Sequence, residues 1–306
     1  MADHYTNMSD LLTALKERLL LYQTSTLSAV KTWKRGVLPP IPTFPALAIL
    51  PVNEALSSPR SGGAYRCDRE LLIEIYTKGL TPEKIMKSNL EIVEAVKDVL
   101  KTEYELDHNA IKRTYDLVMD THTLGEPYPF KNSIVQKSTI PVICRSLEKF
   151  PTMSARDTGR FDTSITDSNP SDLMDKVLGV LSSYGSYTKA PKVQRKGTLP
   201  PCMSYPSLHV LEDTDRKERY AAGVDRPNRI FTIALFNRQL DKEVLLNTLM
   251  TLTEEVKDCL QENPKFGNRC SNSWIPTVDY GTFNTESGPL YGVFITLLTW
   301  GWDPVR

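Results

Sequence analysis

Histidines, the residues best suited to acid–base or metal chemistry at neutral pH, are few in this chain, and no two of them lie close together in the sequence. The histidines are His4, His108, His122 and His209. Asp120 and His122 are two residues apart, a spacing that would put both side chains on one face of a strand. No third ligand and no nucleophile can be placed beside that pair, so a surface strand or turn is the favoured interpretation. We expect no catalytic, cofactor-binding or metal-binding residues and no enzyme activity.

Two other features that could bind a ligand have simpler structural explanations. The segment Arg60-Ser61-Gly62-Gly63 lacks the lysine and the strand-to-helix setting of a phosphate-binding loop, and it precedes a strand, which favours a hairpin loop. The cysteine count is odd and no two cysteines form a CxxC pair, so buried free thiols are favoured over disulfides or a zinc site. These residues are Cys67, Cys144, Cys202, Cys259 and Cys270.

Aromatic residues gather near the C-terminal end of the sequence. A stacking platform for single-stranded nucleic acid would need basic residues between the rings, and this region has almost none. Core packing or an interface anchor is therefore the favoured role. The residues are Trp274, Tyr280, Phe283, Tyr291, Phe294, Trp300 and Trp302.

The charge of the chain is balanced, with 37 basic and 37 acidic residues among 306. No overall field therefore draws the protein to nucleic acid or to an anionic membrane. No apolar run is long enough to cross a bilayer, and the N-terminal sequence lacks the basic and apolar segments of a secretory signal. We expect a soluble protein made in the cytoplasm.

The most informative pattern is an internal repeat. KRGVLPPIPTFPAL, at residues 34–47, recurs as RKGTLPPCMSYPSL at residues 195–208, an offset of 161. The block at Glu94–Leu100 matches Glu254–Leu260 at an offset of 160, and two further blocks keep nearly the same spacing. Matching blocks in the same order indicate a duplicated unit.

We therefore predict two tandem copies, at residues 1–150 and 171–306. The segment between them, residues 151–170, is rich in Ser, Thr and Asp, which is typical of an extended linker or of an arm that orders on a partner. The predicted fold class is α+β, with each copy a small domain that packs helices on a mixed or antiparallel sheet.

Each copy has the same order of predicted elements: helix, proline-rich entry, strand, polar loop, strand, helix and a closing strand region. The proline pairs Pro39-Pro40 and Pro200-Pro201 are expected to hold an extended entry, since proline cannot donate to a ladder. The predicted strands cover residues 44–51, 69–79 and 139–150 in the first copy and 205–212, 229–239 and 288–302 in the second. The polar loops are expected at 57–66 and 214–228.

The helices are defined by caps and apolar stripes. We expect Ser9 or Asp10 to cap the first helix, Thr81 to cap a helix beginning at Pro82, and Asp241 to cap its counterpart. The predicted buried stripes are Met86, Leu90, Val93, Val96 and Leu100 in the first copy, and Leu246, Met250, Thr253, Val256 and Leu260 in the second.

This element order resembles that of the tail terminator (tail completion, or minor tail) proteins of tailed bacteriophages. In the first copy the resemblance is carried by Phe44–Ile49, the loop to Arg66, Glu70–Tyr76 and the helix Pro82–Leu100. The same elements recur from Tyr205 to Leu260. The family usually has one such domain per chain, so two domains are a departure from its pattern.

The resemblance implies a structural virion protein that is assembled in the host cytoplasm. Such a protein forms a ring at the head-proximal end of the tail tube, ends tube polymerisation, and joins the tail to the neck or head. The implied partners are copies of the same chain, the tail tube protein and a neck or head-completion protein, with no cofactor and no membrane. Six chains, or three chains in a pseudo-six-fold ring, would match the symmetry of a tail. Contact with passing DNA would be loose.

Two polar loops are the predicted arms that reach a neighbouring subunit or the tube lumen. The expected interface residues are Arg60, Ser61, Gly62, Gly63, Tyr65, Arg66, Arg216, Lys217, Arg219, Tyr220 and Arg226. A second hypothesis stays open at this point. Duplicated domains often bind a small molecule between their halves, so a two-domain binding protein or enzyme is the alternative.

Overall fold

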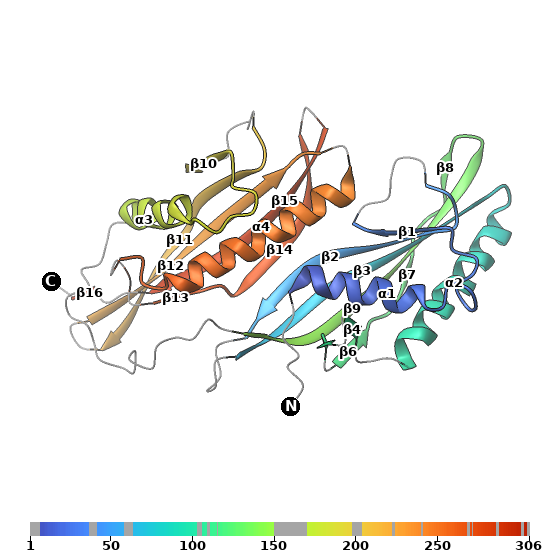
Figure 1. Cartoon of the computed structure of the whole chain (residues 1–306), viewed down its shortest axis with the longest axis horizontal. Helices are drawn as coiled ribbons and strands as arrows, with labels where there is room; N and C mark the ends of the chain where they lie inside the picture. Colours follow the sequence, from blue (N-terminus) through green and yellow to red (C-terminus); the bar gives the residue numbers. More distant parts are fainter. Residues whose placement is uncertain are drawn as a thin grey trace. The chain divides into compact units, whose positions relative to one another are not determined.

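The alternation of apolar and polar residues along the strands builds an α+β protein, as the sequence predicts (Figure 1). The computed structural model describes residues 7–36, 42–57, 64–102, 106–108, 111–114, 116–149, 170–197, 204–221, 224–239, 241–267, 270, 272–285, 288–300 and 303–304. Two compact units are present. The first comprises Met1–Glu54, Arg66–Glu148 and Gln239–Leu246, and the second comprises Ala55–Tyr65, Lys149–Arg238 and Asn247–Arg306.

The first unit has a mixed sheet with strand order β1-β2-β3-β9-β6, in which β7 and β8 also pair with β9. Strand β1 runs parallel to β2, and β6 runs antiparallel to β9. The elements are α1 (Met8–Leu20), β1 (Thr32–Arg35), β2 (Ala46–Leu56), β3 (Ala64–Gly79), α2 (Pro82–Thr102), β6 (Asp116–Met119), β7 (Thr123–Leu124), β8 (Tyr128–Phe130) and β9 (Ser133–Lys149), with β4 (Asp107–His108) and β5 (Ile111–Lys112) forming a separate ladder.

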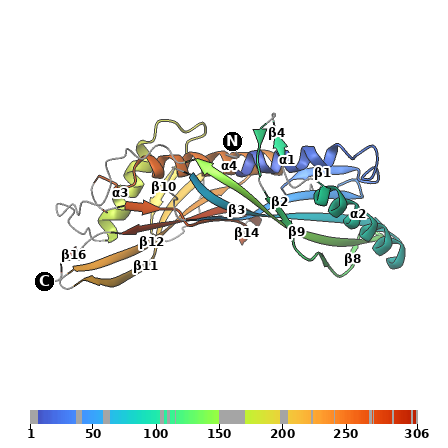
Figure 2. The same cartoon turned by 90° about the horizontal axis from the view of Figure 1, so that it is seen from below.

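Strand β3 shows how this sheet separates its two faces. Its odd-numbered residues from Cys67 to Thr77 are all buried, whereas most of the even-numbered residues from Arg66 to Lys78 are half-buried or exposed. Helix α2 packs on the odd-numbered face, because its Asn89 amide donates to the carbonyl oxygen of Ile75, 3.3 Å away. In Figures 1 and 2, α1 lies over the strands as well. The opposite face of this sheet is called the open face below.

The second unit has strand order β10-β11-β12-β15-β14, with β13 paired to β15 and β16 paired to β12. Strand β10 is parallel to β11, and the other pairs are antiparallel. The elements are α3 (Pro170–Ser183), β10 (Val193–Lys196), β11 (Ser207–Ala221), β12 (Val224–Asn237), the part of α4 (Lys242–Glu262) from Asn247 onward, β13 (Asn272–Trp274), β14 (Thr277–Thr285), β15 (Gly288–Trp300) and β16 (Asp303–Pro304).

Helices α3 and α4 lie on one side of these strands (Figure 2). The core beneath them takes alternate residues from β12 and β15, including the fully buried Phe231, Ile233 and Ile295. All five predicted stripe residues of α4, from Leu246 to Leu260, are buried, so that prediction is confirmed.

The predicted stripe of α2 is wrong at its first two positions and right at Val93, Val96 and Leu100. Met86 is 43% exposed and Leu90 is half-buried, whereas Ile85 and Asn89 are buried. The reason is that a polar residue, Asn89, occupies the centre of the buried face. Because only apolar residues were expected in the stripe, Met86 and Leu90 were predicted in place of Ile85 and Asn89.

The predicted helix starts agree with the structure at two of the three caps. Asp241 Oδ1 accepts from the backbone N–H groups of Glu243 and Val244, at 2.9 and 3.2 Å. Helix α2 begins at Pro82, and the Thr81 carbonyl accepts from the Ile85 N–H. The first helix instead begins after Asn7, whose side chain accepts from the Asp10 N–H at 2.8 Å, so the expected cap by Ser9 or Asp10 is wrong.

The repeated KRG motif has a structure that the sequence did not indicate. Its two basic residues, Lys34-Arg35 in the first copy and Arg195-Lys196 in the second, are the last residues of a short parallel strand. This strand is β1 in the first unit and β10 in the second, and it precedes the proline-rich segment. Gly36 and Gly197 follow at φ of +78° and +85°, a region that favours glycine. Their N–H groups donate to Ile49 and Val210 at 2.7 and 2.9 Å. The proline pairs themselves lie outside the described residues, as do residues 151–169 of the expected linker.

Both units also have a cis peptide bond at the same place in the motif, before Pro45 and before Pro206. In the part of the chain that the structure describes, none of the helices combines the length and the apolar character needed to cross a membrane.

Candidate interaction surfaces

The first predicted arm begins beyond β2. Residues 58–63, which include Arg60, Ser61, Gly62 and Gly63, lie outside the described residues. Tyr65 and Arg66 belong to the start of β3 and not to the loop. The guanidinium of Arg66 forms two hydrogen bonds with the carboxylate of Asp68, at 2.9 and 3.0 Å. Arg66 is therefore engaged within its own strand.

The second predicted arm is a β-hairpin, so the loop expected at residues 214–228 is wrong. Strand β11 continues to Ala221 and β12 begins at Val224. This stretch is highly charged, which suggested a solvated loop, but ladder hydrogen bonds come from the backbone and tolerate charged side chains. Strand β16 pairs with the start of β12 and widens the hairpin.

The register of this hairpin sets opposite charges against each other. Glu218 stands opposite Arg226, and Arg219 stands opposite Asp225. Arg216 and Lys217 stand opposite Asn228 and Pro227. Arg219 and Arg226, two of the predicted interface residues, are therefore each in register with an acidic residue of the same hairpin. Tyr220 follows Arg219 in β11, just before the strand ends at Ala221.

The open face of the first unit carries a line of alternating charges. It runs from Arg66 to Asp68 on β3, then to Arg145 on β9 and to Asp116 on β6. Arg145 lies 4.0 Å from Asp68 and 2.5 Å from Asp116. All four side chains are 33–38% exposed, so solvent screens these pairs and each contributes little to stability.

The same face has a cluster of lysines and aromatic rings, here called the basic–aromatic patch: Phe44, Tyr76, Lys78, Phe130, Lys131 and Lys137. The ammonium of Lys78 lies 5.9 Å from the ring centre of Phe44 and 5.4 Å from that of Phe130. Lys131 lies 5.9 Å from Phe130. These are cation–π distances. Lys131 occupies the turn between β8 and β9 with φ of +54°.

One acidic residue lies beside this patch. Glu74 forms an ion pair with Lys137 and accepts a hydrogen bond from the Tyr76 hydroxyl at 2.6 Å. Burial, and to a smaller extent the charge of Glu74, raises the pKa of Tyr128, whose ring is 41% exposed. Glu74 balances Lys137, so the net positive charge of the patch comes from Lys78 and Lys131.

The second unit has a cluster of ring contacts across β11, β12 and β15. The Phe236 ring on β12 meets His209 on β11 and Phe294 on β15 edge to face, at 5.9 and 5.8 Å. The aromatic residues of the C-terminal region that the structure describes, Trp274, Tyr280, Tyr291, Phe294 and Trp300, are half-buried. This agrees with a packing or interface role. Trp302 and the side chain of Phe283 are not described.

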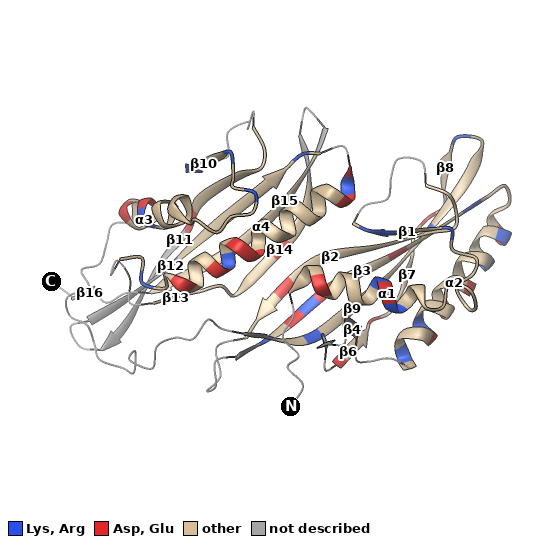
Figure 3. Cartoon of the chain, in the orientation of Figure 1, with Lys and Arg blue, Asp and Glu red and all other residues tan. Residues whose placement is uncertain are grey.

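The long helices of the two units end differently. In α2, Lys101 lies in the last turn and its ammonium is 3.5 Å from Asp98. In α4 the last turn has no basic residue, and Asp258 and Glu262 are exposed. Asp258 and Glu262 are called the acidic helix end below; Figure 3 shows acidic residues in red along the C-terminal half of α4.

Several residues whose types suit acid–base chemistry make local contacts within the fold. The His122 ring Nδ1 lies 2.7 Å from the Lys97 ammonium, in a segment between β6 and β7. Asp120 caps its own turn, since its carboxylate accepts from the Thr121 N–H. Burial raises the pKa of the thiols of Cys144, Cys259 and Cys270 to about 12. Among the described residues, no group of three or more His, Cys, Asp or Glu could hold a metal ion.

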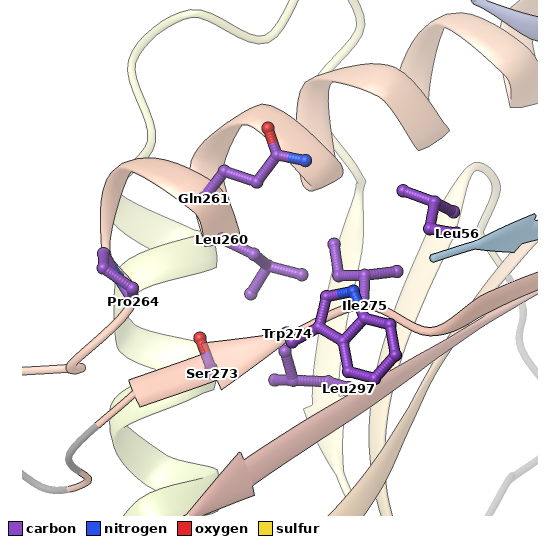
Figure 4. Close-up of a pocket in the computed structure, with 8 residues that line it drawn as sticks. All are labelled: Leu56, Leu260, Gln261, Pro264, Ser273, Trp274, Ile275 and Leu297. Atoms are coloured by element: carbon purple, nitrogen blue, oxygen red, sulfur yellow. The ribbon is translucent and has the colours of Figure 1, made fainter. Parts of the chain in front are cut away.

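A pocket in the second unit lies between the end of α4 and β13 (Figure 4). Its lining is mostly apolar: Leu56, Leu260, Gln261, Pro264, Ser273, Trp274, Ile275 and Leu297. The indole Nε1 of Trp274 is buried and has no hydrogen-bond partner among the described residues. The volume is about 10 Å³, close to what one water molecule requires. It suits a single water and not a small-molecule substrate.

No protein-family model matches the chain, and no curated protein does either. Membership of the tail terminator family therefore stays a prediction from the order of elements.

Proposed function

We propose that the chain is a tandem duplication of one α+β module. The observation that carries this proposal is the shared register of the parallel strand pair. Thr32 pairs with Ala46 in the first unit and Val193 with Ser207 in the second, so each ladder joins residues fourteen apart, and the two ladders lie 161 residues apart. A four-residue parallel strand occurs at the same place in both units, and its repetition in register supports a common origin.

Side-chain contacts at the same offsets support the same proposal. Lys97 bonds Glu94 on α2, and Lys257 bonds Glu254 on α4, with both pairs three residues apart. Arg35 on β1 donates to Thr13 on α1 at 2.5 Å. Lys196 on β10 donates to Asp175 on α3 at 2.6 Å, which is the equivalent pair of positions.

We propose further that the protein is a structural component of a phage virion, which assembles with copies of itself into a ring at the head-proximal end of a tail tube. The tail tube protein and a neck or head-completion protein are its partners in this proposal. Two modules per chain support a ring of three chains with six modules, or a ring of six chains in two tiers. The long β11–β12 hairpin carries Asp215, Glu218 and Asp225 beside its basic residues, which supports contact with protein over tight contact with DNA.

The test is assembly on a tail tube. Tube protein is polymerised with and without the purified chain, and tube length and tube ends are measured by negative-stain microscopy. We expect a ring on one end of each tube and shorter tubes as more chain is added. Tubes of unchanged length without a terminal density would contradict the terminator function.

A second experiment tests the first predicted arm. Shortening the predicted 57–66 arm by removing residues between Leu56, the end of β2, and Ala64, the start of β3, should leave the monomer folded, because β2 and β3 keep their pairing on either side. Ring formation should be impaired. Ring formation that is unchanged would show that this loop is not part of the interface. A full-length variant in which only Arg60 and Arg66 are replaced separates the effect of these two charges from that of loop length.

A further inference from the structure

In the first unit, the end of strand β1 holds the start of helix α4. That unit includes Gln239–Leu246, although α4 belongs by sequence to the second copy. The Lys34 ammonium lies 3.1 Å from the Glu243 carboxylate, and the Arg35 guanidinium lies 3.8 Å from it. Lys16 of α1 is 3.9 Å from the same carboxylate. The first turn of α4 therefore meets three cations, two of which belong to the KRG motif.

The glycine of the motif completes this contact. A Cβ atom at Gly36 would lie 2.9 Å from Cδ2 of Leu246, so the missing side chain lets the leucine approach the motif closely. Leu246 is 5% exposed. The contact thus combines an ion pair with a buried apolar side chain one helical turn further along α4.

The second copy has the same motif at the end of β10, as Arg195-Lys196-Gly197. Arg195 is exposed, and in the described part of the chain no carboxylate lies within ion-pair distance of it. Lys196 bonds Asp175 of its own unit. A Cβ atom at Gly197 would meet none of the described residues within 4 Å. This motif therefore presents a cation and an open glycine, with no helix seated on them among the residues described.

The start of α2 has the matching features. Glu83 and Met86 stand 160 residues before Glu243 and Leu246. Glu83 is exposed and forms no ion pair with any described residue. Met86 is 43% exposed, whereas Leu246 is almost fully buried. A carboxylate and an apolar side chain with the spacing of the α4 contact are thus exposed at the start of α2.

The difference in burial follows one face of the two helices. Residues 83, 86, 87 and 90 have the spacing of a single helix face, and each is more exposed than its counterpart at 243, 246, 247 or 250. Positions beside this face agree between the helices, since Ile85 and Leu245 are both buried and Lys84 and Val244 are both exposed. Met86 and Leu90, predicted from the sequence to be buried, therefore lie on a face that a partner could cover.

We propose that the KRG motif of the second copy binds the start of α2 of a neighbouring chain, as the motif of the first copy binds the start of α4. Arg195 then meets Glu83, and Met86 lies against Gly197. Lys87 brings a cation to the same helix face, so Glu83 and Met86 must supply the attraction. The occupant is a second copy of this chain, because the first unit already shows which helix start this motif fits.

This inference rests on the proposed duplication and the proposed ring, and it makes the ring specific. The two surfaces are unlike, so each chain can bind one neighbour through its motif and another through α2, which is the contact that a closed ring requires. Three chains would then place six motifs and six helix starts in similar contacts.

A charge swap provides the test. Glu83→Arg and Arg195→Glu are made singly and together in the full chain, and sedimentation velocity at ~50 mM salt measures self-association. We expect the wild type to associate and each single variant to associate at least about tenfold more weakly, because like charges then meet. The double variant should regain association, since the charges are again opposite at every contact between chains.

The apolar half of the contact is tested at Met86. Met86→Asp should weaken association by at least about tenfold, because a carboxylate would be buried against the motif. Met86→Leu gives α2 the residue of α4 and should associate at least as well as the wild type. Met86 is exposed in the single chain, so neither change should unfold it, and circular dichroism verifies this.

Matched controls separate this contact from a general effect of charge. Glu91→Arg reverses an exposed acid on α2 whose counterpart, Thr251, is exposed as well. Lys192→Glu reverses an exposed lysine just before β10. Both variants should associate as the wild type does.

Three results would overturn the proposal. These are a wild type that stays monomeric, single reversals that leave association unchanged, and a double variant that associates no better than the single ones. If association follows the expected pattern but the chain does not cap tubes, the terminator function fails and this contact stands. If the chain caps tubes while Glu83→Arg and Arg195→Glu have no effect on association, this contact fails and the terminator function stands.

Discussion

The two units share a backbone frame but bury different chemistry under their long helices. Under α2, the Asn89 amide donates to the carbonyl oxygens of Ile75 and Gln136, and its oxygen accepts from Ser138. The equivalent position of α4, 160 residues later, is Leu249, which is 1% exposed. The short parallel strand pairs have the same register in both units. The helix positions that the proposed repeat aligns differ, with a hydrogen-bonded amide in one unit and an apolar side chain in the other.

A second difference concerns the buried arginine at the start of the central strand. Arg69 is fully buried, its Nε lies 3.2 Å from Glu54, and its guanidinium donates to Ser146. Its equivalent, Arg229, is 5% exposed and stands in register with Thr299, which donates to the Arg229 carbonyl oxygen. In the first unit, a buried ion pair thus links β2, β3 and β9.

The largest expected effect comes from breaking that ion pair. Arg69→Ala should lower the free energy of unfolding of the first unit by about 3–5 kcal/mol, because Glu54 would be left charged and buried. The measurement is urea unfolding with hydrogen exchange of β3 peptides. The control is Arg69→Met with Glu54→Leu, which removes both charges and should be much less destabilising. Equal losses for the single and the double variant would contradict the ion-pair account.

A smaller effect is expected under α2. Asn89→Leu gives the first unit the apolar residue of the second, and it should cost roughly 1–3 kcal/mol because Ser138 and two carbonyl groups lose a buried partner. Leu249→Met in α4 is the matched control and should cost less than about 1.5 kcal/mol. Stabilisation by Asn89→Leu would mean that the amide network does not contribute to folding.

Low pH should destabilise the second unit more than the first. Burial, and then the charge of Arg195, lowers the pKa of His209 below its ordinary 6.5, whereas the first unit has Ala48 at this position. Unfolded chains bind a proton there more readily than folded ones, so stability falls as pH drops below about 6.5, by up to about 1.4 kcal/mol per pH unit. Hydrogen exchange at pH ~7.5 and ~5.5 measures each unit separately. His209→Ala should flatten the dependence of the second unit; an unchanged slope would assign it to other groups.

The smallest effect concerns the helix ends. Gln261→Lys gives α4 the lysine of α2 and should stabilise the isolated chain by about 0.3–1 kcal/mol through the helix dipole. Lys101→Gln is the reciprocal change and should cost at most about 0.5 kcal/mol. Thermal unfolding of dilute protein measures both. Destabilisation by Gln261→Lys would show that the acidic end is already balanced within the chain.

Much of the fold could be predicted because each main element has a clear pattern. The strand at residues 69–79 and the closing strand at residues 139–150 alternate regularly, and Asp241 has the spacing of a cap. The repeat strengthened each predicted helix and strand, because a pattern of apolar and polar residues that occurs in both copies is less easily produced by chance.

The features that were missed have weak or misleading local patterns. The strand Thr32–Arg35 is too short to show alternation, and it is stabilised by its parallel pairing with β2. The hairpin at residues 214–228 is rich in charge, and its strand structure depends on cross-strand pairing between residues that sequence alone does not bring together. Met86 was assigned to the core because the polar Asn89 disrupts the apolar period.

The candidate surfaces were the least predictable part. Arg66 and Arg219 were predicted as interface residues, whereas the structure has Arg66 bonded to Asp68 and Arg219 in register with Asp225. The basic–aromatic patch joins residues from β3, β8, β9 and the entry to β2, and no sequence window contains them all. The acidic helix end was visible only by comparing α2 with α4 position by position.

The mass of the chain in solution, with negative-stain images of the same fraction, tests the central claim most directly. Light scattering at low salt should give three or six chains per particle, and the images should show closed rings with six similar modules around the axis or in each tier. A monodisperse monomer that also fails to bind tail tubes would contradict the account.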